Sequence, residues 1–143
     1  MRTFTLVLLG CSVAFGCTSS SPQSDAGSDS GNPADSGGTP VNGCTTYTDM
    51  TAAGGTITGP SGATPSQYSP NCVHIKVGQS VTWNSDFTNH PLVPTAGVGT
   101  QPNPITATST GTTVTIAFPA AGTFAYNCGI HTSTMFGAVE VTP

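Results

Sequence analysis

Charged side chains are the scarcest component of this sequence. They make up 6% of its 143 residues, and Arg2 and Lys76 are the only basic residues apart from histidine. Soluble proteins usually carry about 25% charged residues. Two such cations cannot form the basic surface that nucleic-acid binding needs, and the formal net charge of −4 points the same way. We therefore exclude nucleic acid as a partner.

Helical signals and long apolar runs are also missing. No window of about 11 residues carries apolar side chains at the spacing of a helix. The apolar run at residues 4–16 is shorter than the about 20 residues that a membrane-spanning helix needs. It follows Arg2 and ends in small residues, which is typical of a signal peptide. Residues 1–16 are therefore predicted to be a signal peptide.

The pair Gly16-Cys17 resembles the processing site of bacterial lipoproteins, in which the cysteine is lipidated and becomes the new amino terminus. On this interpretation the protein is extracytoplasmic, either in the periplasm or anchored to the outer membrane. A lipid on Cys17 would then be its one contact with a membrane. The alternative is ordinary secretion, in which Cys17 is discarded with the leader.

Residues 17–43 are predicted to be the lipidated cysteine followed by a linker. This segment consists mainly of Ser, Asp, Gly and Pro and has almost no apolar side chains. Such a composition cannot bury enough surface to offset the entropy lost on ordering, so we expect disorder. Residues 44–143 remain as the folded domain, which is long enough for one hydrophobic core.

The folded domain consists of short apolar segments separated by Gly, Pro and Asn. It also holds most of the aromatic side chains of the chain. The predicted strands are residues 73–77, 80–83, 112–118, 123–126 and 136–141. Regular short strands with turn signals between them favour an antiparallel all-β sandwich or barrel. The aromatic side chains expected in its core are Trp83, Phe118, Phe124 and Tyr126. The Gly- and Pro-rich residues 94–105 are expected to form a loop.

The cysteines of the folded domain are odd in number: Cys44, Cys72 and Cys128. In an oxidising compartment a disulfide is expected. We interpret Cys44 and Cys72 as the pair, which leaves Cys128 as a free thiol that metal binding would protect. A disulfide from Cys128 to either of the others is the alternative.

Three soft or borderline metal ligands lie within eight residues: Cys128, His131 and Met135. A thiolate, an imidazole and a thioether are three of the four ligands of a blue-copper site. The fourth should be a second histidine, and His90 is available upstream. The alternatives are that the histidines are surface residues and that Met135 only fills the core.

Several segments resemble cupredoxins of the plastocyanin, amicyanin and pseudoazurin kind. Residues 77–83 read Val-Gly-Gln-Ser-Val-Thr-Trp, residues 122–128 read Gly-Thr-Phe-Ala-Tyr-Asn-Cys, and residues 135–139 read Met-Phe-Gly-Ala-Val. The resemblance implies a Greek-key β-sandwich of about eight strands that holds one type 1 copper. The implied equatorial ligands are His90, Cys128 and His131, and Met135 is the implied axial ligand.

The sequence departs from these relatives at the ligands. Three residues separate His131 from Met135, whereas plastocyanin-like loops have four there and amicyanin-like loops two. Pro91 follows His90 where relatives have a residue whose N–H reaches the copper thiolate, and proline has no N–H. Ile130 stands where short-loop relatives often have proline. Our hypothesis is that the Ile130 N–H replaces the lost hydrogen bond to the thiolate.

The resemblance implies a monomeric one-electron carrier that is not an enzyme and whose redox protein partners dock near His131. Leu92, Ile130 and Phe136 are expected to form an apolar rim there. A copper-storage or copper-delivery protein is the alternative, and a metal-free adhesion sandwich is a weaker one. Oxidase or nitrite reductase chemistry needs further copper centres, and only His74 remains to supply histidine ligands.

Overall fold

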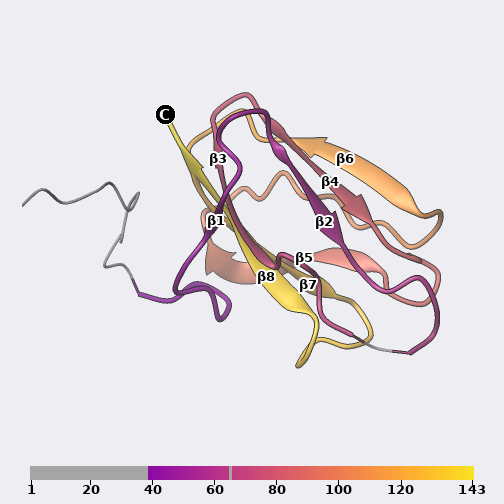
Figure 1. Cartoon of the computed structure of the whole chain (residues 1–143). Helices are drawn as coiled ribbons and strands as arrows, with labels where there is room; N and C mark the ends of the chain where they lie inside the picture. Colours follow the sequence, from indigo (N-terminus) through magenta and orange to yellow (C-terminus); the bar gives the residue numbers. More distant parts are fainter. Residues whose placement is uncertain (1–38, 65) are drawn as a thin grey trace, which may run out of the picture. The chain divides into compact units, whose positions relative to one another are not determined.

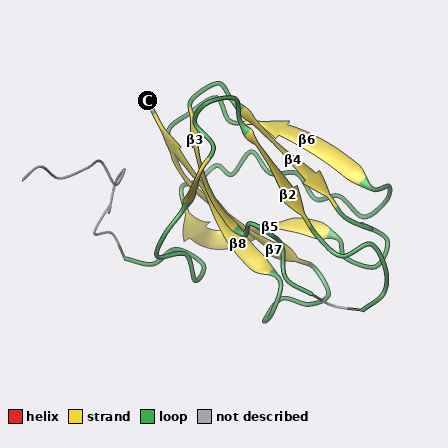
Figure 2. Cartoon of the chain, viewed as in Figure 1, coloured by secondary structure: helices red, strands yellow, loops and turns green. Residues whose placement is uncertain are grey.

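The computed structural model describes residues 39–64 and 66–143, and this part of the chain folds into eight strands without a helix (Figures 1 and 2). The predicted signal peptide, Cys17 and the linker up to residue 38 lie outside the described residues. The strands are β1 (Thr48–Asp49), β2 (Gly55–Thr58), β3 (Cys72–Lys76), β4 (Ser80–Asn84), β5 (Leu92–Gly99), β6 (Thr113–Ala117), β7 (Gly122–Cys128) and β8 (Phe136–Thr142). Within the described residues, no helix is long and apolar enough to cross a membrane.

The strands form two sheets that pack as a sandwich. One sheet has five strands in the order β1-β3-β8-β7-β5, and the other has three in the order β2-β4-β6. The all-β sandwich of eight strands is therefore confirmed. The expected antiparallel pairing is found in β4–β6, β5–β7 and β7–β8. The other pairs, β1–β3, β2–β4 and β3–β8, are parallel, which corrects the expectation for them. The chain passes from β2 in one sheet to β3 in the other and back to β4, so neighbouring strands of a sheet can run in the same direction.

Alternating side chains of the two sheets meet in the core. In β4, Val81 and Trp83 are buried while the residues beside them are not. In β7, Phe124 and Tyr126 are buried, and the rings of Tyr126 and Trp83 meet edge to face with centroids 5.3 Å apart. Phe118 is also buried, so the four aromatic residues predicted for the core are confirmed there.

The segment predicted as a loop at residues 94–105 is strand as far as Gly99. Pro94 pairs with Tyr126 and Gly99 pairs with Phe124, and the register of β5 against β7 shifts between these two points. Gly99 has φ 72°, and a side chain there would collide with the carbonyl oxygen of Thr123. Glycine allows this close approach. Turn-forming residues therefore produce an irregular strand here rather than a loop.

The disulfide between Cys44 and Cys72 is confirmed, and Cys128 is a buried free cysteine. The folded part begins before residue 44, where we expected it to start. The side-chain amide of Asn42 donates hydrogen bonds to the Tyr126 and Gly137 carbonyl oxygens. The last residues of the predicted linker are thus packed against the large sheet.

Replacing both bridged cysteines, Cys44→Ala with Cys72→Ala, should lower the free energy of unfolding. The two positions are 28 residues apart, and a loop of this length predicts a loss of about 3–4 kcal/mol through the entropy of the unfolded chain. Urea unfolding of the metal-free protein measures this change. Adding a reductant to the wild type should produce a similar loss, and a loss below about 1 kcal/mol in both cases would contradict the prediction.

Candidate metal centre

Three of the four predicted ligands come together at one end of the large sheet. His90 lies in the loop between β4 and β5, Cys128 ends β7, and His131 follows in the loop before β8. Their possible ligand atoms all lie within 4.8 Å of one another. The two Nδ1 atoms are 3.1 Å apart, and the thiol Sγ lies 3.6 Å from His131 Nδ1 and 4.0 Å from His90 Nδ1. One thiol and two imidazole nitrogens therefore face a common point.

Burial differs among these side chains. His90 and Cys128 have no exposed surface, whereas His131 is half-buried. Burying a free thiol costs little, but a buried imidazole needs partners for its ring nitrogens, and a metal ion at this point would bind His90 Nδ1. The half-buried His131 ring connects this interior site to the surface.

The ring of His90 is held by a backbone carbonyl. Its Nε2 lies 2.7 Å from the carbonyl oxygen of Gly62, which can only accept, so the Nε2–H donates and Nδ1 faces Cys128 and His131. Metal-binding histidines commonly donate their other ring N–H in this way. This role of Gly62 could not be predicted from the sequence, because a backbone acceptor leaves no side-chain signature.

A turn built on Asp86 places His90. The Asp86 carboxylate accepts hydrogen bonds from the Thr88 N–H at 3.1 Å and the Asn89 side-chain amide at 2.6 Å. The Asp86 carbonyl oxygen accepts the His90 N–H at 2.8 Å. The bond from Asn89 contributes most to lowering the pKa of Asp86, so the carboxylate stays charged. This role of Asp86 was not predicted from the sequence, although Asp and Asn are both common turn residues.

Met135 is fully buried in the same core cluster as Cys128. Its N–H donates to the His131 carbonyl oxygen at 2.9 Å, and its own carbonyl oxygen accepts the Cys128 N–H at 2.8 Å. Residues four apart in such a turn lie on the same side. The three-residue spacing from His131 to Met135 therefore fits one closed turn. Ligation by the Met135 sulfur stays a prediction.

The hydrogen bond to the thiol comes from a different donor than we expected. The His131 N–H points at the Cys128 Sγ, with 3.4 Å between nitrogen and sulfur. No hydrogen bond from the Ile130 N–H to this sulfur is found among the described residues, and the Ile130 side chain is 60% exposed. Pro91 instead contributes its carbonyl oxygen, which accepts the Gly129 N–H at 2.7 Å. The hypothesis of an exchanged donor is therefore corrected from Ile130 to His131.

Only part of the expected apolar rim around His131 is exposed. Leu92 has no exposed surface, so it cannot contact a partner, and Phe136 is half-buried. Ile130 remains as a large exposed apolar side chain beside His131. His74 is not part of the centre, because its Nε2 bonds to the Thr142 hydroxyl at 2.8 Å.

Two buried tyrosines pack near the centre as neutral side chains. Burial, and to a smaller extent Cys128, raises the pKa of Tyr68. Burial also raises the pKa of Tyr126, with a smaller contribution from Tyr68. The two rings meet edge to face with centroids 5.3 Å apart. The surroundings of the thiol are therefore apolar and uncharged on this side.

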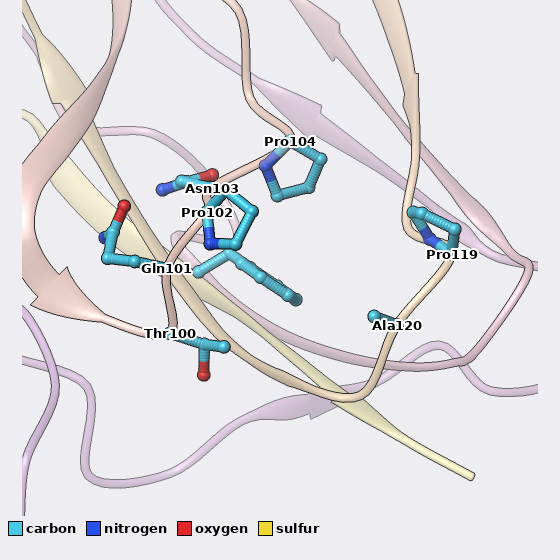
Figure 3. A pocket seen from close by; sticks show the side chains of 8 residues that line it. Thr100, Gln101, Pro102, Asn103, Pro104, Pro119 and Ala120 are labelled. Atoms are coloured by element: carbon cyan, nitrogen blue, oxygen red, sulfur yellow. The ribbon is translucent and has the colours of Figure 1, made fainter.

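A surface pocket of about 260 Å³ lies at the other end of β7 and shares no residue with the centre (Figure 3). Its walls are mostly apolar and include the ring of Phe124, whereas Cys128 is the last residue of the same strand. The remaining lining residues are Thr100, Gln101, Pro102, Asn103, Pro104, Pro119 and Ala120. The pocket is thus no part of the candidate metal centre.

Comparison with known proteins agrees with the expected family. The profile of the family described as copper binding proteins, plastocyanin/azurin family, matches residues 55–142, which include all four predicted ligands. A purple cupredoxin from Nitrosopumilus maritimus is similar, with 26% identity over 62% of this chain and 99% of that chain and a TM-score of 0.47. The comparison with curated proteins found no match.

Two further solved structures are also similar. Amicyanin, in the reduced state of a variant, has 25% identity over 64% of this chain and 83% of that chain, with a TM-score of 0.44. A copper-containing nitrite reductase from Thermus scotoductus SA-01 has 21% identity over 62% of this chain and 22% of that chain, with a TM-score of 0.46. The matched part is thus a small portion of that reductase.

The turn that holds His90 can be tested with Asp86→Ala. Without its carboxylate the turn loses two hydrogen bonds, so His90 is less well placed, and we expect the affinity for copper to fall about tenfold. Competition with a chelator measures this change. Asp49→Ala is the control, because the Asp49 carboxylate caps a similar exposed turn through the Thr51 N–H. Equal affinities in the two variants would contradict the prediction.

The donor to the thiol can be tested with two substitutions. Ile130→Pro removes an N–H that does not reach the sulfur, so we expect an almost unchanged reduction potential. Pro91→Ala restores an N–H after His90, and a further donor to the thiolate should favour Cu(I) and raise the potential. Redox titration of the copper-loaded variants measures both. A large fall in Ile130→Pro would mean that Ile130, and not His131, supplies the bond.

Proposed function

Because the chain belongs to the plastocyanin/azurin family of copper-binding proteins, we propose that it is a one-electron carrier whose single type 1 copper cycles between Cu(II) and Cu(I). The observation that carries this proposal is the buried free thiol of Cys128 facing the Nδ1 atoms of His90 and His131. We propose these three as the equatorial ligands and Met135 as the axial ligand. Copper bound there supplies a one-electron redox couple.

The donor set and its supports suit electron transfer. Thiolate and thioether favour Cu(I), while imidazole also suits Cu(II), so one set of side chains serves both states. Gly62 holds the His90 ring and the Cys128–Met135 backbone bond closes the loop. Because protein contacts hold these side chains in place, they need to move little when one electron arrives or leaves. This low reorganisation is what a carrier requires.

The half-buried His131 is the route we propose for electrons to enter and leave, with redox protein partners docking around it. Ile130, 60% exposed, supplies apolar contact there. Because only 6% of residues are charged, docking should depend weakly on ionic strength. We propose that the protein acts as a non-catalytic monomer.

We also propose an extracytoplasmic location, either periplasmic or anchored to the outer membrane through Cys17, with secretion as the alternative. The Cys44–Cys72 disulfide supports this, because disulfides persist mainly in oxidising compartments.

Visible absorption and EPR spectra after Cu(II) addition test the copper site. We expect an intense thiolate-to-copper charge-transfer band with narrow copper hyperfine splitting. Cys128→Ser should abolish the band, whereas His74→Ala should leave it unchanged because His74 bonds to Thr142. A colourless wild type would overturn the proposal that Cys128 is a ligand.

The rate of electron exchange separates the carrier from a copper-storage or copper-delivery protein. A carrier should exchange electrons rapidly with a small redox mediator and hold its copper for many turnovers. Stopped-flow mixing measures the first property, and transfer to a chelator measures the second. Slow electron exchange together with rapid copper loss would favour storage or delivery.

A further inference from the structure

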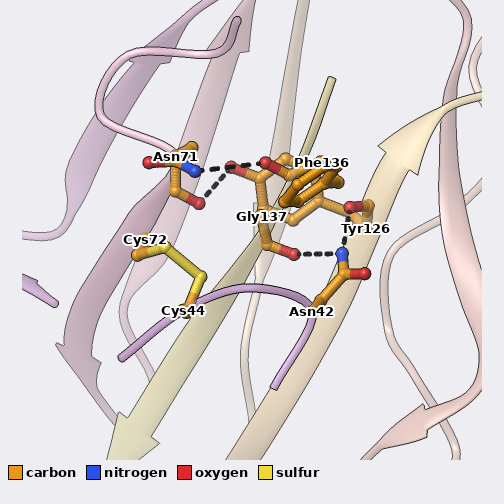
Figure 4. Close-up of a disulfide and its surroundings, with 7 residues drawn as sticks. All are labelled: Asn42, Cys44, Asn71, Cys72, Tyr126, Phe136 and Gly137. Carbon is orange, nitrogen blue, oxygen red and sulfur yellow. Dashed lines mark hydrogen bonds between the residues drawn. A yellow bond between two sulfur atoms is a disulfide. The ribbon is translucent and has the colours of Figure 1, made fainter. Parts of the chain in front are cut away.

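The N-terminal arm, which we define as residues 41–44, binds the base of the ligand loop. We define this loop as residues 128–135, between the end of β7 and the start of β8. The Asn42 side-chain amide donates to the Tyr126 carbonyl oxygen at 2.8 Å and to the Gly137 carbonyl oxygen at 2.9 Å (Figure 4). Tyr126 lies two residues before Cys128, and Gly137 lies two residues after Met135. One side chain therefore joins both strands from which the ligand loop emerges.

The disulfide holds the arm in this position. The Cys44 N–H donates to the Val41 carbonyl oxygen at 3.0 Å, which closes a turn around Asn42. The bridge to Cys72 then attaches this turn to the start of β3 (Figure 4). Asn42 has φ 52°, a conformation that asparagine tolerates better than most residues. Asn42 is thus suited to the turn as well as to the two carbonyl oxygens.

A second set of contacts reaches the same strands from the other side of the disulfide. Asn71, next to Cys72, donates through its side chain to the Phe136 carbonyl oxygen at 3.3 Å. Its carbonyl oxygen accepts the Tyr126 hydroxyl at 2.8 Å and the Ala138 N–H at 3.1 Å. A side chain at Gly137 would collide with this oxygen, so the backbones pack directly together.

We propose that Asn42, held in place by the Cys44–Cys72 disulfide, is a positioning residue that fixes the Met135 end of the ligand loop relative to Cys128. This inference rests on the proposed function, because its consequence is the placement of an axial ligand. The Cys128 N–H to Met135 carbonyl bond of 2.8 Å lies directly beyond the two strands that Asn42 joins. A shift between these strands changes the position of Met135 relative to Cys128.

The test uses Asn42→Asp in the full-length protein. The carboxylate has nearly the shape of the amide and tolerates the same φ, but it cannot donate and it repels both carbonyl oxygens. In the metal-free protein, we expect hydrogen exchange of the Cys128 amide to become about tenfold faster through local opening. In the copper-loaded protein, we expect a changed EPR rhombicity and a shifted reduction potential.

Asn103→Asp is the matched control. Asn103 also donates its side-chain amide to a β7 carbonyl oxygen, that of Ala125, at 2.7 Å, but it makes no bond to β8. It should leave the Cys128 amide exchange and the EPR spectrum unchanged. Asn42→Gly keeps the backbone conformation and removes the donor without adding charge, so it should reproduce the faster exchange in milder form.

The outcomes separate this inference from the proposed function. One outcome is that Asn42→Asp lowers only the global stability, which the denaturant dependence of exchange measures. If its local exchange and its EPR spectrum then match those of Asn103→Asp, the positioning role is wrong. If the wild type shows no charge-transfer band, the proposed function fails, and exchange in the metal-free protein still decides whether Asn42 holds the loop.

Discussion

The hydrogen bond from the Cys128 N–H to the Met135 carbonyl oxygen is the interaction on which the candidate centre depends. It continues the pairing of β7 with β8 to the point where the ligand loop leaves the sheet. Within the loop, the Met135 N–H donates to the His131 carbonyl oxygen at 2.9 Å and closes a turn. Without this closure, Cys128 and His131 would share a flexible loop, and the His131 N–H would have no fixed position relative to the sulfur. The sheet thus gives the loop its geometry.

His90 lies in the loop that joins β4 of the small sheet to β5 of the large sheet, and its placement is a separate problem of polar burial. A buried imidazole costs free energy unless both ring nitrogens have partners. Gly62 satisfies Nε2 through its carbonyl oxygen, and Nδ1 is left for the centre. The half-buried Asp86 supports the backbone of His90, because its carbonyl oxygen accepts the His90 N–H. The buried ring of His90 is thus held by uncharged backbone groups.

The two ends of β7 differ in character. At one end Cys128 faces the histidines, and at the other Phe124 lines a mostly apolar pocket (Figure 3). Between them, Tyr126 packs against Trp83, and its hydroxyl donates a hydrogen bond to the Asn71 carbonyl oxygen. This arrangement connects the core, the disulfide and the ligand loop through one strand. The effect that we propose for the Cys44–Cys72 bridge on the centre would pass through this strand.

Local patterns in the sequence by themselves determined the all-β class, the buried aromatic residues and the short spacing of Cys128, His131 and Met135. They could do so because alternation and spacing along one strand or loop are properties of neighbouring residues. The tertiary structure alone decided the parallel pairs, the strand at residues 94–99, the burial of Leu92 and the docking of Asn42. It also decided that His131 and Gly62 supply the supporting backbone groups. These features depend on segments far apart in the chain and on backbone groups. Every residue except proline has both an N–H and a C=O group, so no residue type predicts these contacts.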